Sequence, residues 1–195
     1  LLADRQSLPE TDYDSIDRGN LTHRVLELFW GETQTQSNLK RIAAEGIPEE
    51  RVRAFTHKAM TESGFKAKWK SQDNYRAIEE DRMTNLITSW LNFELNRADF
   101  TVVEQEKREL FDFFGFKLQR KADRIDQYPD GSRLLIDYKT GEATPDAWFK
   151  EPVREPQLPL YACGIKPDGI AFAQVKKGNI AIKVAQKENM QTEGV

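Results

Sequence analysis

The chain has 195 residues, a mass of 22.5 kDa and a formal net charge of −3, with 38% hydrophobic and 31% charged residues. This length suffices for one well-cored domain with a helical annex, and no apolar run is long enough for a membrane span. With a pI near 5.6, bulk charge does not favour nucleic-acid binding, so such a site must be a local basic patch or use metal ions to offset phosphate charge.

The first half of the chain is predicted to be helical after a short lead-in. Residues 1–18 are polar and aperiodic, which predicts an extended segment. Residues 19–98 follow a helical pattern that opens with "GNLTHRVLELFWGE", where Asn20 is a candidate N-cap. A second helix is predicted to start at the Pro-Glu-Glu of residues 48–50, and a third to cover about 74–96.

The second half changes to strand formers. Its predicted elements are strands at 100–106, 116–126 and 133–140, a turn at Pro129-Asp130-Gly131, a helix over about 155–164 and a hairpin turning at Gly178-Asn179. The order predicts an α/β (α+β) fold with a mixed sheet flanked by helices. We expect residues 19–98 to form a helical part, residues 99–185 an α/β catalytic core and residues 186–195 a tail.

Two acidic residues are predicted to meet across the hairpin that surrounds Asp130. In "LLIDYKTG" a buried strand ends with Asp137 and Lys139 on one face, because strand side chains alternate. A hairpin centred on Asp130 places Asp123 opposite Asp137, and like charges so placed are destabilising. A divalent cation would neutralise the pair. The alternatives are a solvated face with ordinary ion pairs, or a register shifted by one residue that turns the faces apart.

Four motifs in this order resemble the RecB/AddB group of nuclease domains within the PD-(D/E)XK superfamily. They are "GNLTHRVLE", "ADRID", "DYKTG" and "QLPLY", and the resemblance spans about residues 17–175. Where this group has Gly or Arg and Ile before the first Asp, Lys121 and Ala122 stand here, which we interpret as a harmless variation at non-catalytic positions.

The resemblance implies a metal site. Asp123 and Asp137 would bind Mg²⁺ or Mn²⁺, with His23 as an additional ligand. One more acidic residue is expected from the preceding strand, and Glu106 is favoured over Glu104. Without the resemblance, His23 would be interpreted as a hydrogen-bonded core residue, and the two glutamates as a solvated edge strand.

Lys139 would position the attacking water or stabilise developing charge, and a pKa lowered by burial beside the metal would let it join proton transfer. Its alternative role is a salt bridge to the two aspartates with no metal present. Asp126, three residues beyond Asp123, is expected to face away and to be structural.

Contacts with DNA are also implied. Gln157 and Tyr161, four residues apart on a helix, would border the active site, unless they are a helix cap and a core tyrosine. Basic clusters at 65–70 and 117–121 are candidates for phosphate contacts, with Trp69 available to stack on a base. The alternative for each cluster is an ordinary solvated surface.

Related proteins often hold an iron–sulfur cluster through cysteines that flank the nuclease core. This chain has only Cys163, so no such cluster is expected, and a single cysteine fits a reducing, cytoplasmic location. A start at Leu1 without methionine is expected of a fragment, and the resemblance implies a helicase or helicase-like region in the same or a partner polypeptide.

The sequence leaves three functions open. The first is a metal-dependent DNA nuclease that acts in repair or recombination, with single-stranded DNA as the favoured substrate and exonuclease activity favoured over endonuclease activity. The second is a catalytically silent nuclease fold that serves as a DNA-binding or interaction module. The third is a restriction-type or junction-resolving endonuclease, which would not be expected to share the "GNLTH" and "QLPLY" matches.

Overall fold

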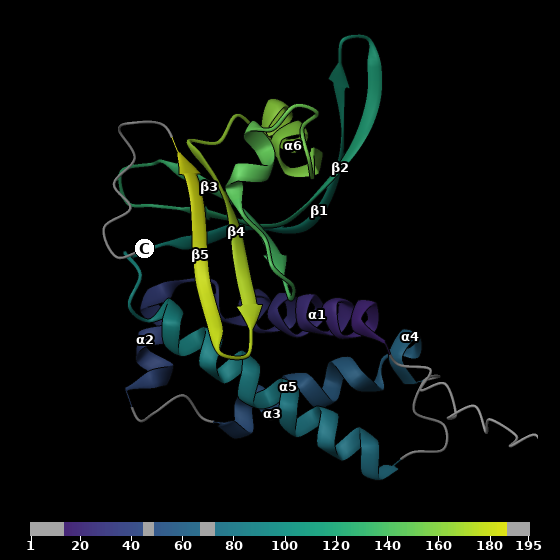
Figure 1. The fold of residues 1–195 in the computed structure, drawn as a ribbon. Helices are drawn as coiled ribbons and strands as arrows, with labels where there is room; N and C mark the ends of the chain where they lie inside the picture. The colour runs from purple at the N-terminus through teal and green to yellow at the C-terminus, as the bar shows by residue number, and fades with distance from the viewer. Residues whose placement is uncertain (1–13, 45–48, 67–72, 187–195) are drawn as a thin grey trace, which may run out of the picture.

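The computed structural model describes residues 14–44, 49–66 and 73–186 (Figure 1). Its helices are α1 (Ser15–Thr33), α2 (Gln36–Ala43), α3 (Glu49–Thr61), α4 (Ser63–Lys66), α5 (Asp73–Glu94), the 3₁₀ helix η2 (Pro145–Phe149) and α6 (Gln157–Ile165). Its strands are β1 (Thr101–Phe113), β2 (Phe116–Gln127), β3 (Arg133–Lys139), β4 (Gly169–Lys176) and β5 (Asn179–Gln186).

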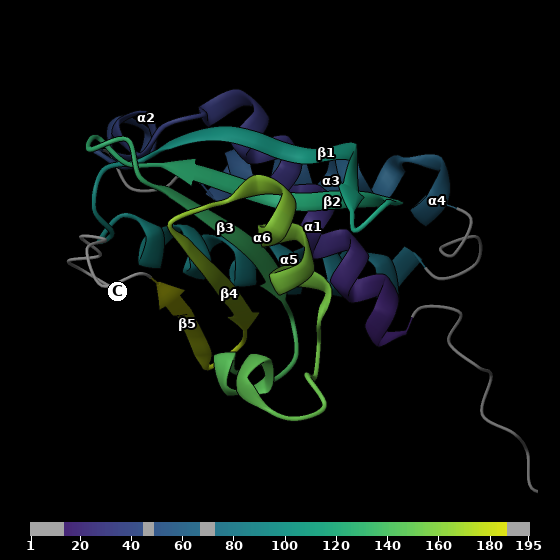
Figure 2. The same cartoon turned by 90° about the horizontal axis from the view of Figure 1, so that it is seen from above.

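The strands form one mixed sheet, as the sequence predicted. Within the described residues it has five strands in the order β1-β2-β3-β4-β5, all antiparallel neighbours except the parallel pair β3 and β4. A parallel pair needs a crossover, and α6 lies in the segment that joins these two strands. Helices α1, α3 and α5 lie on one face of the sheet and α6 on the other (Figures 1 and 2). In the described ranges no helix combines the length and the apolarity that a membrane crossing requires.

Helix α1 begins earlier than the sequence predicted. Its N-cap is Asp14, whose carboxylate accepts hydrogen bonds from the backbone N–H groups of Ile16 and Asp17. The Asp17 side chain accepts in return from the Asp14 N–H, which completes a capping box. The prediction that Asn20 caps the helix was therefore wrong, and residues 15–18 are helical rather than extended. Residues 187–195 of the predicted tail lie outside the described residues.

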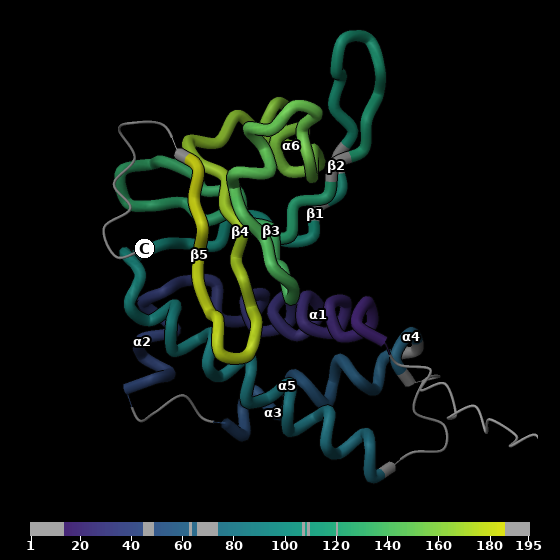
Figure 3. The backbone as a smooth tube through the Cα atoms, viewed as in Figure 1, coloured from purple at the N-terminus to yellow at the C-terminus, as the bar shows by residue number. Residues whose placement is uncertain are grey.

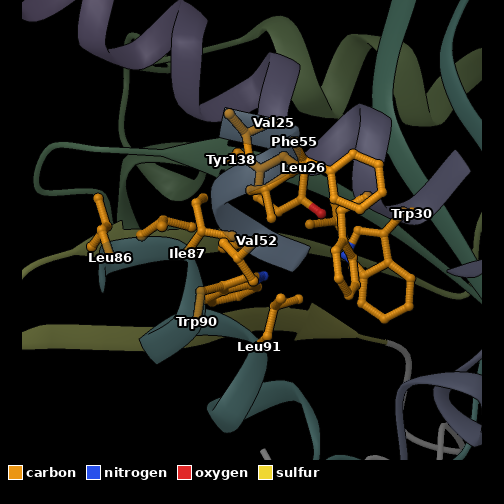
Figure 4. Close-up of a cluster of buried hydrophobic side chains, with 14 of the residues drawn as sticks. Val25, Leu26, Trp30, Val52, Phe55, Leu86, Ile87, Trp90, Leu91 and Tyr138 are labelled. Atoms are coloured by element: carbon orange, nitrogen blue, oxygen red, sulfur yellow. The ribbon is translucent and has the colours of Figure 1, made fainter. Parts of the chain in front are cut away.

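Two clusters of buried apolar residues pack against the two faces of the sheet. The larger one lies between the sheet and α1, α3 and α5 (Figure 4), and includes Val25, Leu26, Trp30, Val52, Phe55, Ile87, Trp90, Leu91 and Tyr138. The smaller one lies under α6 and η2, and includes Ile125, Leu135, Trp148, Leu158 and Phe172. Strand β3 contributes to both clusters, since Leu134 and Ile136 belong to the first and Leu135 to the second. The strand that carries Asp137 and Lys139 is thus fixed from both sides.

Strand β1 is longer than expected and forms an arm with β2. It was predicted to end near residue 106 but continues to Phe113, and the ribbon projects beyond the body of the sheet (Figures 1 and 3). The turn consists of Phe114 and Gly115, with φ values of 51° and 82°. Positive φ at both central residues matches the twist that two-residue hairpins prefer. Asp112 Oδ1 accepts a hydrogen bond of 3.0 Å from the Gly115 N–H and so supports the turn.

Candidate active site

The two aspartates stand beside each other at the end of the β2–β3 ladder. The paired residues run from Gln127↔Arg133 to Arg124↔Ile136, which is the register predicted for the hairpin. One more residue on each strand places Asp123 against Asp137. Asp123 Oδ2 also accepts a hydrogen bond of 2.9 Å from the Tyr138 N–H, so its carboxylate is held against the end of β3.

His23 reaches this point from α1. Its Nε2 lies 2.9 Å from the carbonyl oxygen of Tyr138, and its Nδ1 lies 3.4 Å from Asp123 Oδ2. A carbonyl only accepts hydrogen bonds, so Nε2 carries hydrogen and the neutral ring keeps its lone pair on Nδ1. Burial alone would lower the pKa of His23, but its hydrogen bond and attraction to Asp123 outweigh burial and raise the pKa above its usual value. Nδ1 is therefore the atom of His23 available to a metal ion.

Glu106 completes a group of three donors with His23 and Asp123. It lies between Gln105 and Lys107, whose partners Arg124 and Ala122 flank Asp123. One ligand atom from each of the three donors lies within 4.8 Å of the other two. Glu106 has a φ of 48°, a conformation that non-glycine residues adopt at a cost and that is frequent at functional sites. Among the described residues, Glu106 and not Glu104 belongs to this group, and its role as a metal ligand stays a prediction.

Lys121 lies beside the donor group, because its ammonium forms an ion pair with Glu106. Residues two apart on a strand share a face, and Lys121 lies two before Asp123. The interpretation of Lys121 as a harmless variation at a non-catalytic position stays a prediction. Burial raises the pKa of Glu106, with repulsion from Asp123 adding to it and Lys121 opposing it.

Asp137 and Lys139 form an ion pair beside the three donors. Lys139 Nζ lies 2.9 Å from Asp137 Oδ2 and 3.6 Å from Glu155 Oε2. Burial, followed by repulsion from Asp123, raises the pKa of Asp137 to about 6. Burial alone would lower the pKa of Lys139, but Asp137 and Glu155 outweigh it and raise the pKa. The carboxylates around the ammonium stabilise its charge, and the lower pKa expected of Lys139 beside a bound metal ion stays a prediction.

The donor set fits a divalent cation. Glu106 and Asp137 both have raised pKa values, which reflect burial and the repulsion that each receives from Asp123. A cation would relieve that repulsion, and oxygen ligands with one imidazole suit Mg²⁺ or Mn²⁺. The residues that would hold it are His23, Glu106 and Asp123, with Asp137 adjacent and shared with Lys139.

Helix α6 begins next to Lys139. Glu155, which contacts Lys139, lies two residues before the helix. Gln157 Nε2 donates a hydrogen bond of 2.9 Å to Tyr161 Oη, so the two predicted border residues act as one pair on the helix surface. The sequence analysis did not predict this contact of Glu155, because the residue lies in an irregular segment that has no recognisable sequence pattern. Its own φ is 52°. Trp69 and residues 67–70 of the basic cluster lie outside the described residues.

A buried charge network supports the site from behind. Arg124, next to Asp123 on β2, donates to both carboxylate oxygens of Glu94 at 2.9 and 3.0 Å and to Asp126 Oδ2 at 2.8 Å. Arg97 joins Asp126 at 2.9 Å, and all four side chains are at most 1% exposed. Asp126 therefore faces away from Asp123, as predicted. The sequence predicted the orientation of Asp126 but not its network, because Glu94 and Arg97 come from α5 and the segment after it.

The fold and this site define a class of protein. A mixed sheet brings two aspartates and a lysine to one point, and the first helix adds a histidine. A family model described as the PD-(D/E)XK nuclease superfamily matches residues 1–193, and the chain belongs to this superfamily. Its members are generally metal-dependent nucleases that act on DNA, so the chain has a nuclease fold.

Other comparisons add little. A search of curated proteins found no match. Among solved structures, the crystal structure of SSO0001 is similar at 16% identity and a TM-score of 0.32, covering 86% of this chain and 66% of that chain.

Proposed function

We propose that the chain is a Mg²⁺- or Mn²⁺-dependent deoxyribonuclease of the RecB/AddB type that acts as an exonuclease on single-stranded DNA. Its context would be DNA repair or recombination, as the nuclease domain of a larger helicase-like protein. The observation that supports the proposal best is the cluster of His23, Glu106 and Asp123 beside the Asp137–Lys139 ion pair. The four motifs of the sequence support the RecB/AddB assignment.

Each side chain has a role in this proposal. A divalent cation would neutralise phosphate charge and lower the pKa of a water molecule. His23 would offer Nδ1 while Tyr138 fixes its ring through Nε2, and the Tyr138 N–H would orient Asp123. Lys139, held by Asp137 and Glu155, would stabilise the negative charge that grows on the phosphate as water attacks.

The test is hydrolysis of linear and circular single-stranded DNA and of duplex DNA, with Mg²⁺, Mn²⁺ or EDTA. Asp137→Ala should lower the rate by roughly 10²–10⁴-fold, the usual effect of losing an electrostatic or acid–base group. Asp99→Ala is the matched control, because Asp99 is a solvent-exposed carboxylate that pairs with Lys40 away from the site.

The outcomes separate the alternatives. Release of short products from linear but not circular strands supports an exonuclease, whereas cleavage of circles supports an endonuclease. Metal-independent DNA binding without hydrolysis would instead favour the catalytically silent module.

A further inference from the structure

The β1–β2 arm, residues 107–121, exposes an unusual amount of apolar surface. Beyond Glu106 and Asp123 its two strands pair with each other up to Phe113↔Phe116. Leu110, Phe114 and Phe116 are 67%, 88% and 71% exposed. A projecting two-stranded ribbon gains little stability from such residues, and exposed apolar groups that gather in this way mark an interaction surface.

The composition of the arm indicates the kind of partner. The segment "KRELFDFFGFKLQRK" contains four phenylalanines, five basic and two acidic residues, a net charge of +3 in a chain whose net charge is −3. Aromatic rings among positive charges are the combination that binds single-stranded nucleic acid, where rings stack on bases and cations contact phosphates. Two copies of the chain that paired through the free edge of β1 would instead bring two positive arms together.

The arm is continuous with the candidate active site. Glu106 and Asp123 are the residues from which its strands emerge, and Lys121 at its base forms an ion pair with Glu106. A strand rises about 3.3 Å per residue, so the tip lies roughly 25 Å from the donor cluster. The arm is also braced by α6, since a Cβ atom on Gly164 would lie 3.0 Å from the Phe111 ring.

We propose that the β1–β2 arm binds the single-stranded part of the substrate and leads it to the donor cluster. Phe114 and Phe116 stack on unpaired bases, while Arg108 and Lys117, both exposed, contact phosphates. Duplex bases are already stacked on each other, so the arm favours single strands. This inference rests on the proposed nuclease function and adds the element that selects the substrate.

Binding tests the arm without any need for catalysis. The anisotropy of a fluorescent single-stranded oligonucleotide, measured in EDTA at low salt, should give a Kd that is about 10-fold weaker or more for the Phe114→Ala/Phe116→Ala variant. Ile78→Ala is the matched control, because Ile78 is 61% exposed on α5, and it should bind like the wild type. Absence of binding by the wild type, or equal binding by the double variant, would overturn the proposal.

The basic residues give an independent measurement. Removing two phosphate contacts with Arg108→Ala/Lys117→Ala should reduce the slope of log Kd against log salt by about 1.4. An unchanged slope contradicts the proposed contacts. Sedimentation is the remaining check, because arm substitutions that dissociate a dimer and leave oligonucleotide binding intact would make the arm an interface between copies.

The same variants distinguish this inference from the nuclease proposal. A p-nitrophenyl ester of a nucleotide is too small to reach from the donor cluster to the tip of the arm, so the double phenylalanine variant should hydrolyse it at the wild-type rate. If the wild type binds the strand, the double variant binds it more weakly and neither substrate is hydrolysed, the nuclease proposal fails while binding of single strands by the arm is supported. If the wild type degrades single strands and the double phenylalanine variant binds and degrades them equally well, the proposal for the arm is contradicted and the nuclease proposal is supported.

Discussion

Lys139 is placed so that its substitution should affect DNA hydrolysis and metal binding differently. Its ammonium lies 2.9 Å from Asp137 and 3.6 Å from Glu155, and 5.4 Å from the centre of the Phe172 ring. These contacts hold a charged group beside the donor cluster. A cation in that position repels a metal ion and attracts a phosphate, so its removal should affect the two processes differently.

We expect Lys139→Ala to bind Mn²⁺ as tightly as the wild type or slightly more tightly, while DNA hydrolysis falls by about 10²–10⁴-fold. Lys139→Arg should not restore the rate, because the planar guanidinium is bulkier and does not lose its proton. Calorimetry with Mn²⁺ and single-turnover hydrolysis measure the two effects. Wild-type hydrolysis by Lys139→Ala, or loss of its Mn²⁺ binding, would remove the role given to this residue.

Asp137 gives the metal-free protein a defined pH dependence. Its pKa of about 6 lies above the value of about 3.9 expected in the unfolded chain. Between these values the folded state binds more protons, so the free energy of unfolding falls as pH rises from about 4 to 6. In EDTA, Asp137→Asn should flatten this part of the profile and raise the Tm at neutral pH, because it resembles the protonated acid.

Urea titrations across this pH range, on the wild type and on Asp137→Asn, measure the difference. The difference between the two profiles reports the titration of Asp137 together with its effect on His23, whose pKa the charge of Asp137 raises. A variant that is less stable than the wild type at neutral pH would show that the Lys139 ion pair outweighs burial and repulsion.

Because side chains alternate along strand β2, one of its faces contributes to the donor cluster and the other to the buried charge network. Asp123 faces the donor cluster, while Arg124 and Asp126 face α5 and its buried Glu94. Alternation and the turn at Asp130 were enough to predict that Asp123 and Asp137 meet. They did not predict the partners of Arg124, because contacts between distant elements depend on how the helices are laid against the sheet.

The buried network should be strongly coupled to stability. Asp126→Asn removes one negative charge that Arg97 and Arg124 share. Breaking a buried ion pair in this way lowers the free energy of unfolding by about 3–5 kcal/mol. For a chain of this size, that corresponds to a drop in Tm of roughly 6–20 °C. Asp99→Asn, which breaks an exposed pair with Lys40, should cause little change. Equal Tm values for the two variants in a thermal melt would contradict the structural role of the network.

The fold class was predictable, because the first half of the sequence has a helical pattern and the second half is mostly strand formers with one helix between them. The β1–β2 arm was not, because Phe114-Gly115 is not a familiar turn pair and the segment "KRELFDFF" shows no clear alternation. The start of α1 was missed because its capping box lies in a segment that looked featureless. Glu155 and Lys121 joined the site through the tertiary arrangement, although Lys121 was on the right face by simple parity.

The donor cluster joins layers that are also held by apolar packing and by the buried Arg124–Glu94 ion pair. His23 comes from α1, Glu106 from β1 and Asp123 from β2, so one bound ion would fasten the helical layer to the sheet. Because the ion binds the assembled site and not the unfolded chain, it should stabilise the whole fold. At a Mn²⁺ concentration of about 100 times Kd the gain is about 2.7 kcal/mol, or roughly 5–10 °C in Tm.

We expect this increase in the wild type and in the Asp99→Asn control. It should be absent from His23→Ala and Asp123→Ala, because each removes one donor of the cluster. Differential scanning fluorimetry with increasing Mn²⁺, compared with Ca²⁺ and EDTA, measures the shift. An equal increase in both donor variants would mean that the ion binds elsewhere, and that α1 and the sheet are held together without it.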